Sequence, residues 1–356
     1  MKKKRYLIKD SLENINIFRF YSRPIKNIDK FQRALHESLL SLYAWKSIKK
    51  EITYKKFDAI IYYSPSIFFG DLVKKIKTCC HCPAYLILRD FFPQWAIDEG
   101  IIKKNSLIEK YFRYFERKSY NEANMIGVTS ESNLNLFKNR FSDQYPVSIL
   151  NNWASLNPIK KCEMKFSVRN NLDLKDKIIY FYGGNIGQAQ DMENLMRLVK
   201  SMIPFSSAHF LFIGQGDEVN LILELAKKWN LNNFTYLPSV DQIEFKNILS
   251  EVDIGLFSLS PRHTSHNFPG KLLGYMVQSL PILGSVNKGN DLLNIINNNN
   301  AGFICYNGED DILLKNAILL YENIELRKSL GNNSFRLLKD EYSTSSAAKN
   351  ILSYLK

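Results

Sequence analysis

A proline, a glycine and a lysine follow one another where the sequence predicts that a helix begins. Pro269 and Gly270 turn the chain, Lys271 falls in the first helical turn, and Pro281 opens a short apolar strand further on. Backbone N–H groups at a helix start and the positive end of the helix dipole favour an anion, and Lys271 adds a full charge. The stretch therefore suits a phosphate, although a simple turn with a solvated lysine explains the same residues equally well.

Two glycine motifs come directly after predicted strands. Residues 178–182 run into Gly183-Gly184-Asn185-Ile186-Gly187, and residues 209–213 run into Gly214-Gln215-Gly216. Either motif alone is weak, because a Gly-x-Gly after a strand often means only close helix packing. Two at neighbouring strand ends, with the helix start at Lys271, predict a rim of backbone donors for a nucleotide diphosphate. The spacing fits neither the dinucleotide fingerprint nor the P-loop, which disfavours NAD binding and ATP hydrolysis.

Strands and helices alternate in the first half of the chain, which predicts a parallel sheet covered on both faces. The predicted strands are residues 58–65, 84–90, 125–130 and 147–150, and the predicted helices include residues 68–77 and 106–121. Ligands of such sheets bind beyond the carboxyl ends of the strands. Candidate site residues are therefore the polar ones at those ends: Ser64, Ser66, Arg89, Asp90, Gln94, Ser130 and Glu131.

A second alternation follows a polar segment, residues 151–167, that we interpret as a linker. Its further strands are predicted at residues 234–238, 253–257, 281–283 and 302–305, and its last helices at residues 310–320, 324–338 and 345–355. We predict a first domain over residues 1–153, a second over residues 168–342, and a terminal helix over residues 343–356 that crosses back to the first domain.

Positive charge is concentrated in the first half. Residues 1–150 hold 27 Lys and Arg against 15 Asp and Glu, so this half carries nearly all of the net charge of +13. Such asymmetry indicates an anionic partner: lipid headgroups, a diphosphate-containing substrate or nucleic acid. No nucleic-acid-binding motif accompanies the charge, which favours the first two. The apolar spacing over residues 31–48 favours a core helix over one that lies at a membrane surface.

The five cysteines do not form the regular spacing of a disulfide framework, and we expect reduced thiols. Cys79, Cys80, His81 and Cys82 lie too close together to surround one tetrahedral ion, and no second pair follows at finger spacing. We therefore interpret them as a lead-in from a loop to a strand rather than a zinc site. The sequence has no apolar run long enough to span a bilayer and no secretory apolar region after Met1, which predicts a cytoplasmic protein.

Taken in order, these motifs resemble retaining glycosyltransferases of the GT-B fold, family GT4 (group 1). The second half carries the resemblance in residues 182–187, 212–216, 236–238, 268–276 and 280–282, and the first half in residues 88–93 and 126–131. Bacterial O-antigen and capsule enzymes, including the fucosamine-transferring, WbuB-like group, share this order of motifs. The resemblance extends from about Phe57 to Tyr342.

The resemblance implies an α/β protein of the GT-B fold, with two Rossmann-like domains whose parallel sheets face a cleft. The first domain would be incomplete, because the family's opening strand and glycine-rich loop have no counterpart before Lys9. The implied reaction moves a hexosyl or N-acetylhexosaminyl unit from a UDP- or GDP-type donor to a lipid-diphosphate-linked saccharide, with retention. It would take place at the inner face of the cytoplasmic membrane, on an anionic lipid surface, without a metal or other cofactor.

The resemblance also implies roles for individual residues. Arg89 and Asp90 would face the sugar or the acceptor. The family's usual pair of glutamates, eight positions apart, is replaced by His266 and Gly274, and no base follows Gly184 before Gln190. The donor would be held by Gly183, Gly184, Asn185, Gly187, Gly214, Gly216, Leu237, Pro238, Phe268, Pro269, Gly270, Lys271 and Leu272.

Two other functions stay open at this point. The chain would be a shortened, inactive relative that binds a nucleotide sugar without transferring it, or a basic protein that binds membranes or nucleic acid without chemistry. An in-frame strand and glycine-rich loop encoded upstream of Met1 would argue against the first, and clustering of Lys and Arg in a groove would favour the second.

Overall fold

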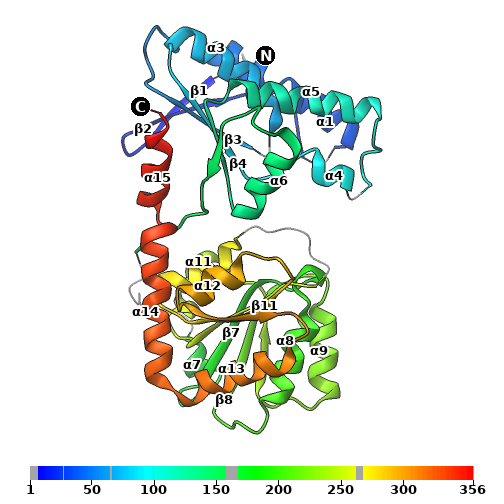
Figure 1. Ribbon diagram of the computed structural model, residues 1–356, viewed down its shortest axis with the longest axis vertical. Coiled ribbons are helices and arrows are strands. Elements are labelled where there is room, and N and C mark those ends of the chain that lie inside the picture. The colour runs from blue at the N-terminus through cyan, green and yellow to red at the C-terminus, as the bar shows by residue number, and fades with distance from the viewer. Residues whose placement is uncertain are drawn as a thin grey trace, which may run out of the picture. The chain divides into compact units, whose positions relative to one another are not determined.

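The structure is a computed structural model that describes residues 7–26, 28–64, 66–98, 100–157, 167–261 and 268–355, with the side chains of residues 30 and 31 excepted. The chain separates into two compact units (Figure 1). Unit 1 comprises Met1–Thr129, Asn133–Leu150 and Lys349–Lys356, and unit 2 comprises Ser130–Ser132 and Asn151–Ala348. Each unit is an α/β structure built on its own parallel sheet.

The sheet of unit 1 has four strands in the order β3-β4-β5-β6. Its inner strand β4 is buried along its whole length, as expected of a strand covered on both faces. The register places Leu88 of β4 opposite Val128 of β5, so the residues that follow, Arg89 and Thr129, leave the sheet at the same edge. The strands are β3 (Ile60–Ser64), β4 (Ala84–Leu88), β5 (Met125–Val128) and β6 (Val147–Ile149).

Helices cover this sheet, and a separate antiparallel hairpin precedes it. The hairpin turns at Glu13, which has a positive φ of 52°. Ser106 caps α5 by accepting the N–H of Glu109, so the predicted helix starts where its N-cap indicates. The elements are β1 (Leu7–Leu12), β2 (Ile15–Phe20), α1 (Lys30–Ser38), α2 (Leu40–Ile48), α3 (Gly70–Cys80), α4 (Gln94–Asp98), α5 (Leu107–Glu122) and α6 (Glu131–Phe141).

Two sequence interpretations of unit 1 need correction. The segment predicted as one helix over residues 31–48 is two helices, α1 and α2, and α2 buries Leu40 and Ala44 in the unit. The helix predicted over residues 68–77 continues to Cys80, so Cys79 and Cys80 lie in its last turn and not in a loop. The residues that the structure describes contain no cluster of three or more metal-ligating side chains. None of the described helices has the length and apolar character needed to cross a membrane.

The sheet of unit 2 has six parallel strands in the order β12-β11-β10-β7-β8-β9. The chain winds outward from β7 through β8 and β9, then returns to the other side of β7 with β10, β11 and β12. The winding direction therefore reverses between β7 and β10, and ligands of doubly wound sheets bind at such a switch point, beyond the carboxyl ends of the strands. The strands are β7 (Ile178–Asn185), β8 (Ala208–Gln215), β9 (Phe234–Leu237), β10 (Ile254–Ser258), β11 (Ile282–Val286) and β12 (Gly302–Tyr306).

Helices pack on both faces of this sheet, and each face has its own hydrophobic core. Successive side chains of β7 belong alternately to these two cores. Phe181 belongs to the core under α10, α11, α12 and α14, whereas Tyr180 and Tyr182 belong to the core under α8, α9 and α13. The helices are α7 (Val168–Asn171), α8 (Met192–Ser201), α9 (Val219–Lys228), α10 (Gln242–Leu249), α11 (Gly270–Val277), α12 (Leu292–Asn298), α13 (Asp310–Glu322), α14 (Ile324–Glu341) and α15 (Thr344–Ser353), which enters unit 1 at Lys349.

A buried histidine in β8 makes unit 2 sensitive to acid. His209 lies with Nε2 at 2.9 Å from Thr235 Oγ1, and burial, aided by Lys177, lowers the pKa of His209 to about 4. Because the unfolded chain binds this proton more tightly, the free energy of unfolding should fall as the pH drops from about 6.5 to about 4, by about 3 kcal/mol in total. Denaturant unfolding across this window should show that slope, and His209→Asn should remove it.

The exposed His81 provides the control for this prediction. His81→Asn changes a histidine at the end of α3 in unit 1, where a positive φ of 54° suits asparagine. In this variant the free energy of unfolding of unit 2 should still fall between pH 6.5 and 4. If the free energy of unfolding of His209→Asn still falls between pH 6.5 and 4, other groups cause the acid sensitivity.

Candidate functional site

The two glycine motifs lie side by side at the edge of the unit 2 sheet. Strands β7 and β8 pair in register, with Gly184 opposite Gly214, so both strands run further than predicted and include glycines expected in turns. A Cβ atom at Gly214 would overlap the carbonyl oxygen of Gly184, and one at Gly216 would overlap that of Ile186. Glycine is therefore required at 214 and 216 by the close contact of the two chains.

Several backbone N–H groups around these motifs already donate within unit 2. The N–H of Gly183 donates to Tyr275 Oη at 3.3 Å, and the N–H of Ile186 donates to the Gln215 carbonyl at 2.9 Å. The N–H of Glu218 donates to the Ile186 carbonyl at 3.0 Å. These three amides hold the sheet edge together, so the rim of donors expected from the sequence is narrower than the two motifs suggest.

The start of α11 offers both space and charge at the switch point. Pro269 is the N-cap, and a Cβ at Gly270 would meet no atom of the described residues within 4 Å, so none of these residues fills the volume beside the first turn. The first N–H groups of any helix lack intrahelical acceptors. Lys271 reaches from this turn, which follows β10, to β7: its Nζ donates to Tyr182 Oη at 2.7 Å and lies 3.9 Å from the centre of the Tyr182 ring.

The ammonium of Lys271 lacks a counter-charge of its own in the described residues, none of whose carboxylates forms an ion pair with it. Burial lowers the pKa of Lys271 to about 7. Tyr182 stays neutral, because burial raises its pKa, and it donates to the Asn185 carbonyl at 2.5 Å. A desolvated cation without an acidic partner is stabilised by an arriving anion.

Tyr275 anchors the helix that carries Lys271 to the sheet. It lies four residues further along α11, on the same face of the helix, and its fully buried hydroxyl donates to the Leu256 carbonyl at 3.2 Å. The ring covers Gly255, where a Cβ would clash with it. Tyr182 and Tyr275 are thus site residues that the sequence analysis did not select; the i, i+4 spacing from Lys271 was the available signal for Tyr275.

Two residues predicted to hold the donor have buried side chains. Leu272 is fully buried and Phe268 is nearly so, both within the core under α11, and Phe268 packs against the ring of Tyr342 at 4.4 Å between centroids. Both side chains point into the core, and a contact of their backbone atoms with the donor stays a prediction. His266 lies outside the described residues.

The other predicted contacts lie at the carboxyl ends of the strands. Asn185 closes the end of β7 with its Nδ2 donating to Gln190 Oε1 at 2.8 Å, and a Cβ at Gly187 would lie 2.5 Å from Asp217 Oδ1. Leu237 ends β9 and Pro238 follows it, with Leu237 packed against the core. Their contact with a ligand stays a prediction.

Arg89 and Asp90 belong to unit 1, directly after β4, and both are half-buried. Burial raises the pKa of Asp90, against a hydrogen bond from Trp95 that lowers it. Their catalytic role stays a prediction.

Comparison with known proteins gives three kinds of match. Residues 164–336 match the sequence model of the family described as glycosyl transferases group 1. The probable glycosyltransferase WbjE of Pseudomonas aeruginosa is 26% identical over 262 residues, which make up 72% of this chain and 64% of WbjE. The match thus spans less than two thirds of that curated relative.

Solved structures share the fold at low identity. Sucrose-phosphate synthase from Thermosynechococcus elongatus superposes with a TM-score of 0.66 at 12% identity, over 99% of this chain and 85% of the other. Anabaena HepE in complex with UDP has a TM-score of 0.67 at 12% identity, over 89% and 83%. These likenesses confirm the predicted GT-B fold. Residues 164–336, which contain Lys271 and both glycine motifs, are thus similar in sequence to the glycosyl transferases of group 1.

Proposed function

We propose that this protein transfers a sugar from a nucleoside diphosphate sugar whose diphosphate binds at Lys271. One observation carries the proposal: a desolvated ammonium without an acidic partner in the described residues lies at the switch point of the sheet, beside the open first turn of α11. HepE and TarM, two proteins with the same fold, have been solved in complex with UDP, which supports a UDP-type donor over a GDP-type one.

In this proposal the positive groups of unit 2 stabilise the leaving diphosphate. Lys271 has three N–H donors, so it keeps its hydrogen bond to Tyr182 while it donates to a phosphate oxygen. The first amides of α11 and the helix dipole add to that stabilisation. The charge of the diphosphate is balanced by these groups, so the proposed reaction does not depend on a metal ion.

The proposed reaction retains the configuration of the sugar. The bond between the anomeric carbon and the phosphate oxygen breaks, the acceptor hydroxyl oxygen bonds to the same face of that carbon, and the leaving phosphate takes the hydroxyl proton. No pair of carboxylates is needed for this same-face transfer. Arg89 and Asp90 of unit 1 are proposed to contact the sugar or the acceptor, since Asp90 is a half-buried acid at a strand end.

The acceptor is proposed to be a lipid-diphosphate-linked saccharide in O-antigen or capsule synthesis. The likeness to the probable glycosyltransferase WbjE supports sugar transfer, and the positive charge of residues 1–150 suits a diphosphate on a lipid carrier. Transfer of fucosamine or a related N-acetylhexosamine is the narrower form of this proposal.

A panel of UDP- and GDP-sugars offered with a lipid-diphosphate-linked saccharide tests the proposal. Mass spectrometry should detect one glycosylated product together with the released nucleoside diphosphate. Donor binding without product would make the protein a binding relative of the family. Absence of both binding and transfer would overturn the assignment of the donor site.

UDP binding should be coupled to proton uptake at Lys271. The free amine has its pKa lowered to about 7, and a bound diphosphate should raise that pKa, so the complex holds more protons than the free protein above pH 7. Affinity for UDP should therefore fall as the pH rises above about 7, by up to about tenfold per pH unit. Calorimetry in buffers with different ionisation enthalpies measures the uptake directly.

The control for this coupling is Lys271→Arg. Arginine stays protonated throughout this range, so the variant should bind UDP without the additional proton uptake. Any uptake by UDP itself is common to both proteins. Equal proton uptake in the two proteins would show that Lys271 does not titrate in the donor site.

A further inference from the structure

Helix α5 of unit 1 presents apolar side chains to solvent that the proposed reaction does not use. Leu107 is 83% exposed, Ile108 and Tyr114 are each 58% exposed, and Tyr111 is 39% exposed. Leu107, Tyr111 and Tyr114 stand at positions i, i+4 and i+7, so they form one stripe along the helix. The buried residues of the helix, Glu116, Ser119 and Tyr120, lie on its other side. A contiguous exposed apolar stripe of this kind marks an interaction surface.

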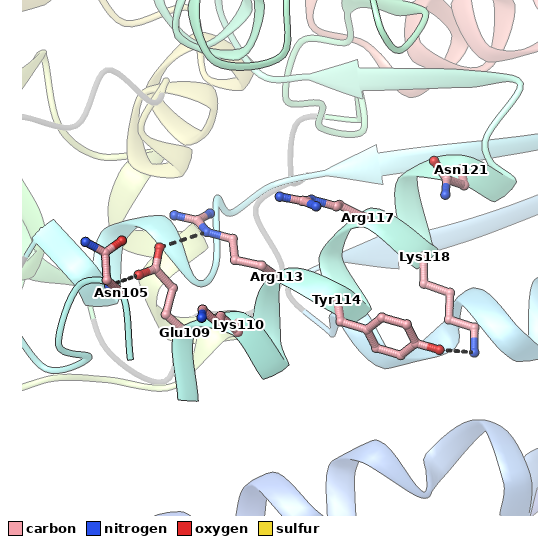
Figure 2. A pocket seen from close by; sticks show the side chains of 8 residues that line it. All are labelled: Asn105, Glu109, Lys110, Arg113, Tyr114, Arg117, Lys118 and Asn121. Atoms are coloured by element: carbon pink, nitrogen blue, oxygen red, sulfur yellow. Dashed lines mark hydrogen bonds and ion pairs between the residues drawn. The ribbon is translucent and has the colours of Figure 1, made fainter. Parts of the chain in front are cut away.

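Basic side chains accompany the stripe and line a pocket of about 550 Å³. Figure 2 shows its lining along α5, with Arg113 and Arg117 pointing to one side and Tyr114 and Lys118 together on the other. Lys110 completes the basic part of the lining. We define the α5 face as the apolar stripe together with the two exposed cations beside it: Leu107, Ile108, Lys110, Tyr111, Tyr114 and Arg117.

The basic side chains that line this pocket differ in whether they form ion pairs. Arg113 pairs with Glu109 at 3.3 Å and with the buried Glu116 at 3.1 Å, and Lys118 pairs with Asp71 at 2.6 Å. Lys110 and Arg117 form no ion pair with any residue that the structure describes. These two charges are therefore available to an anionic partner.

The aromatic residues of α5 are held in place by their neighbours. The Tyr111 ring contacts Phe112 and Phe115 at 5.5 and 5.1 Å between centroids, and Phe115 contacts Phe68 at 4.9 Å. Beneath the helix, Glu116 pairs with Arg140 at 3.0 Å as well as with Arg113. The α5 face is thus a rigid surface, which lowers the entropy lost on binding.

We propose that the α5 face docks unit 1 on an anionic phospholipid bilayer. The apolar and tyrosine side chains would enter the boundary between headgroups and acyl chains, while Lys110 and Arg117 meet lipid phosphates. Lys103 and Lys104, both exposed just before the helix, add to the attraction. A second copy of the chain would bring the same positive charge to this face, so charge complementarity favours lipid over self-association.

Sedimentation with vesicles of phosphatidylglycerol and phosphatidylcholine tests the proposal without any donor or acceptor. The full chain should bind at low salt and be partly released as salt screens the charges. Lys110→Gln with Arg117→Gln should weaken binding about thirtyfold, since each basic residue near an anionic surface contributes a factor of about five to the affinity. Lys49→Gln with Lys50→Gln removes the same charge from the exposed end of α2 and should cost less than about threefold.

The apolar stripe has its own pair of variants. Leu107→Ser with Tyr114→Ser should weaken vesicle binding about tenfold and remove the binding that persists at high salt, because that part rests on apolar insertion. Ile243→Ser changes a side chain of α10 that is 72% exposed and should have no effect. Circular dichroism would verify that each variant is folded, and UDP affinity should be unchanged in all of them.

Several results would overturn the proposal. The first is that the full chain does not bind vesicles. The second is that Lys49→Gln with Lys50→Gln weakens vesicle binding as much as Lys110→Gln with Arg117→Gln does. The third is that the chain self-associates with rising concentration and does not bind vesicles. Tight binding of nucleic acid with none to vesicles would do the same. Because these measurements omit the donor, their failure leaves the Lys271 site untouched, and failure of UDP binding leaves the α5 face untouched.

Discussion

Replacing Lys271 by methionine is expected to weaken UDP binding about hundredfold while leaving the ligand-free protein at least as stable as before. Methionine keeps the apolar stem and removes the ammonium that donates to Tyr182. Loss of a desolvated charged donor to a phosphate costs about 3 kcal/mol, which corresponds to about a hundredfold change in affinity. In the free protein the same ammonium is desolvated without an acidic partner among the described residues, so its removal relieves an electrostatic cost.

Calorimetry with UDP and thermal unfolding measure the two halves of this prediction. Lys246→Met, on the exposed side of α10 in the same unit, is the matched control and should alter neither quantity. Unchanged UDP affinity in Lys271→Met would remove Lys271 from the donor site. Loss of stability together with affinity would mean that Lys271 serves the fold and not the ligand.

Two glycine-to-alanine substitutions in unit 2 should have opposite effects on stability. Gly214→Ala is expected to lower the free energy of unfolding by at least about 3 kcal/mol, because its Cβ would overlap the Gly184 carbonyl and force β7 and β8 apart. Gly274→Ala lies inside α11, where its Cβ would make an ordinary contact of 3.4 Å with Leu249 Cδ1. Alanine favours the helix, so this variant should gain about 0.5–1 kcal/mol.

Hydrogen exchange of the β7 and β8 amides reports the stability of unit 2 separately from that of unit 1. Faster exchange in Gly214→Ala and slower exchange in Gly274→Ala are the expected results. Native exchange in Gly214→Ala would show that the two strands tolerate a wider spacing. Destabilisation by Gly274→Ala would place another group against that face of α11.

Local and periodic features of the fold could be predicted from the sequence. Alternating strands and helices indicated two α/β units, and the helix predicted over residues 106–121 and the Pro269-Gly270 pair placed the starts of α5 and α11 correctly. Helix α10 was missed, although Asp241 and Glu244 form the spacing of a capping box and Asp241 accepts two N–H groups at the helix start. The glycines at 183 and 184 were placed in a turn because glycine usually ends a strand, whereas pairing with β8 extends β7 through them.

The sequence alone determined the class of the protein: an α/β chain with a positively charged first half, glycine motifs after two strands and a lysine in the first turn of a helix. Only the tertiary structure decided that the Lys271 amine reaches Tyr182, 89 positions earlier, at the point where the sheet reverses its winding. The same is true of the contact between Gly214 and Gly184 and of the side of α5 left in solvent. These features depend on strand order and helix packing between distant segments, which no local pattern of residues encodes.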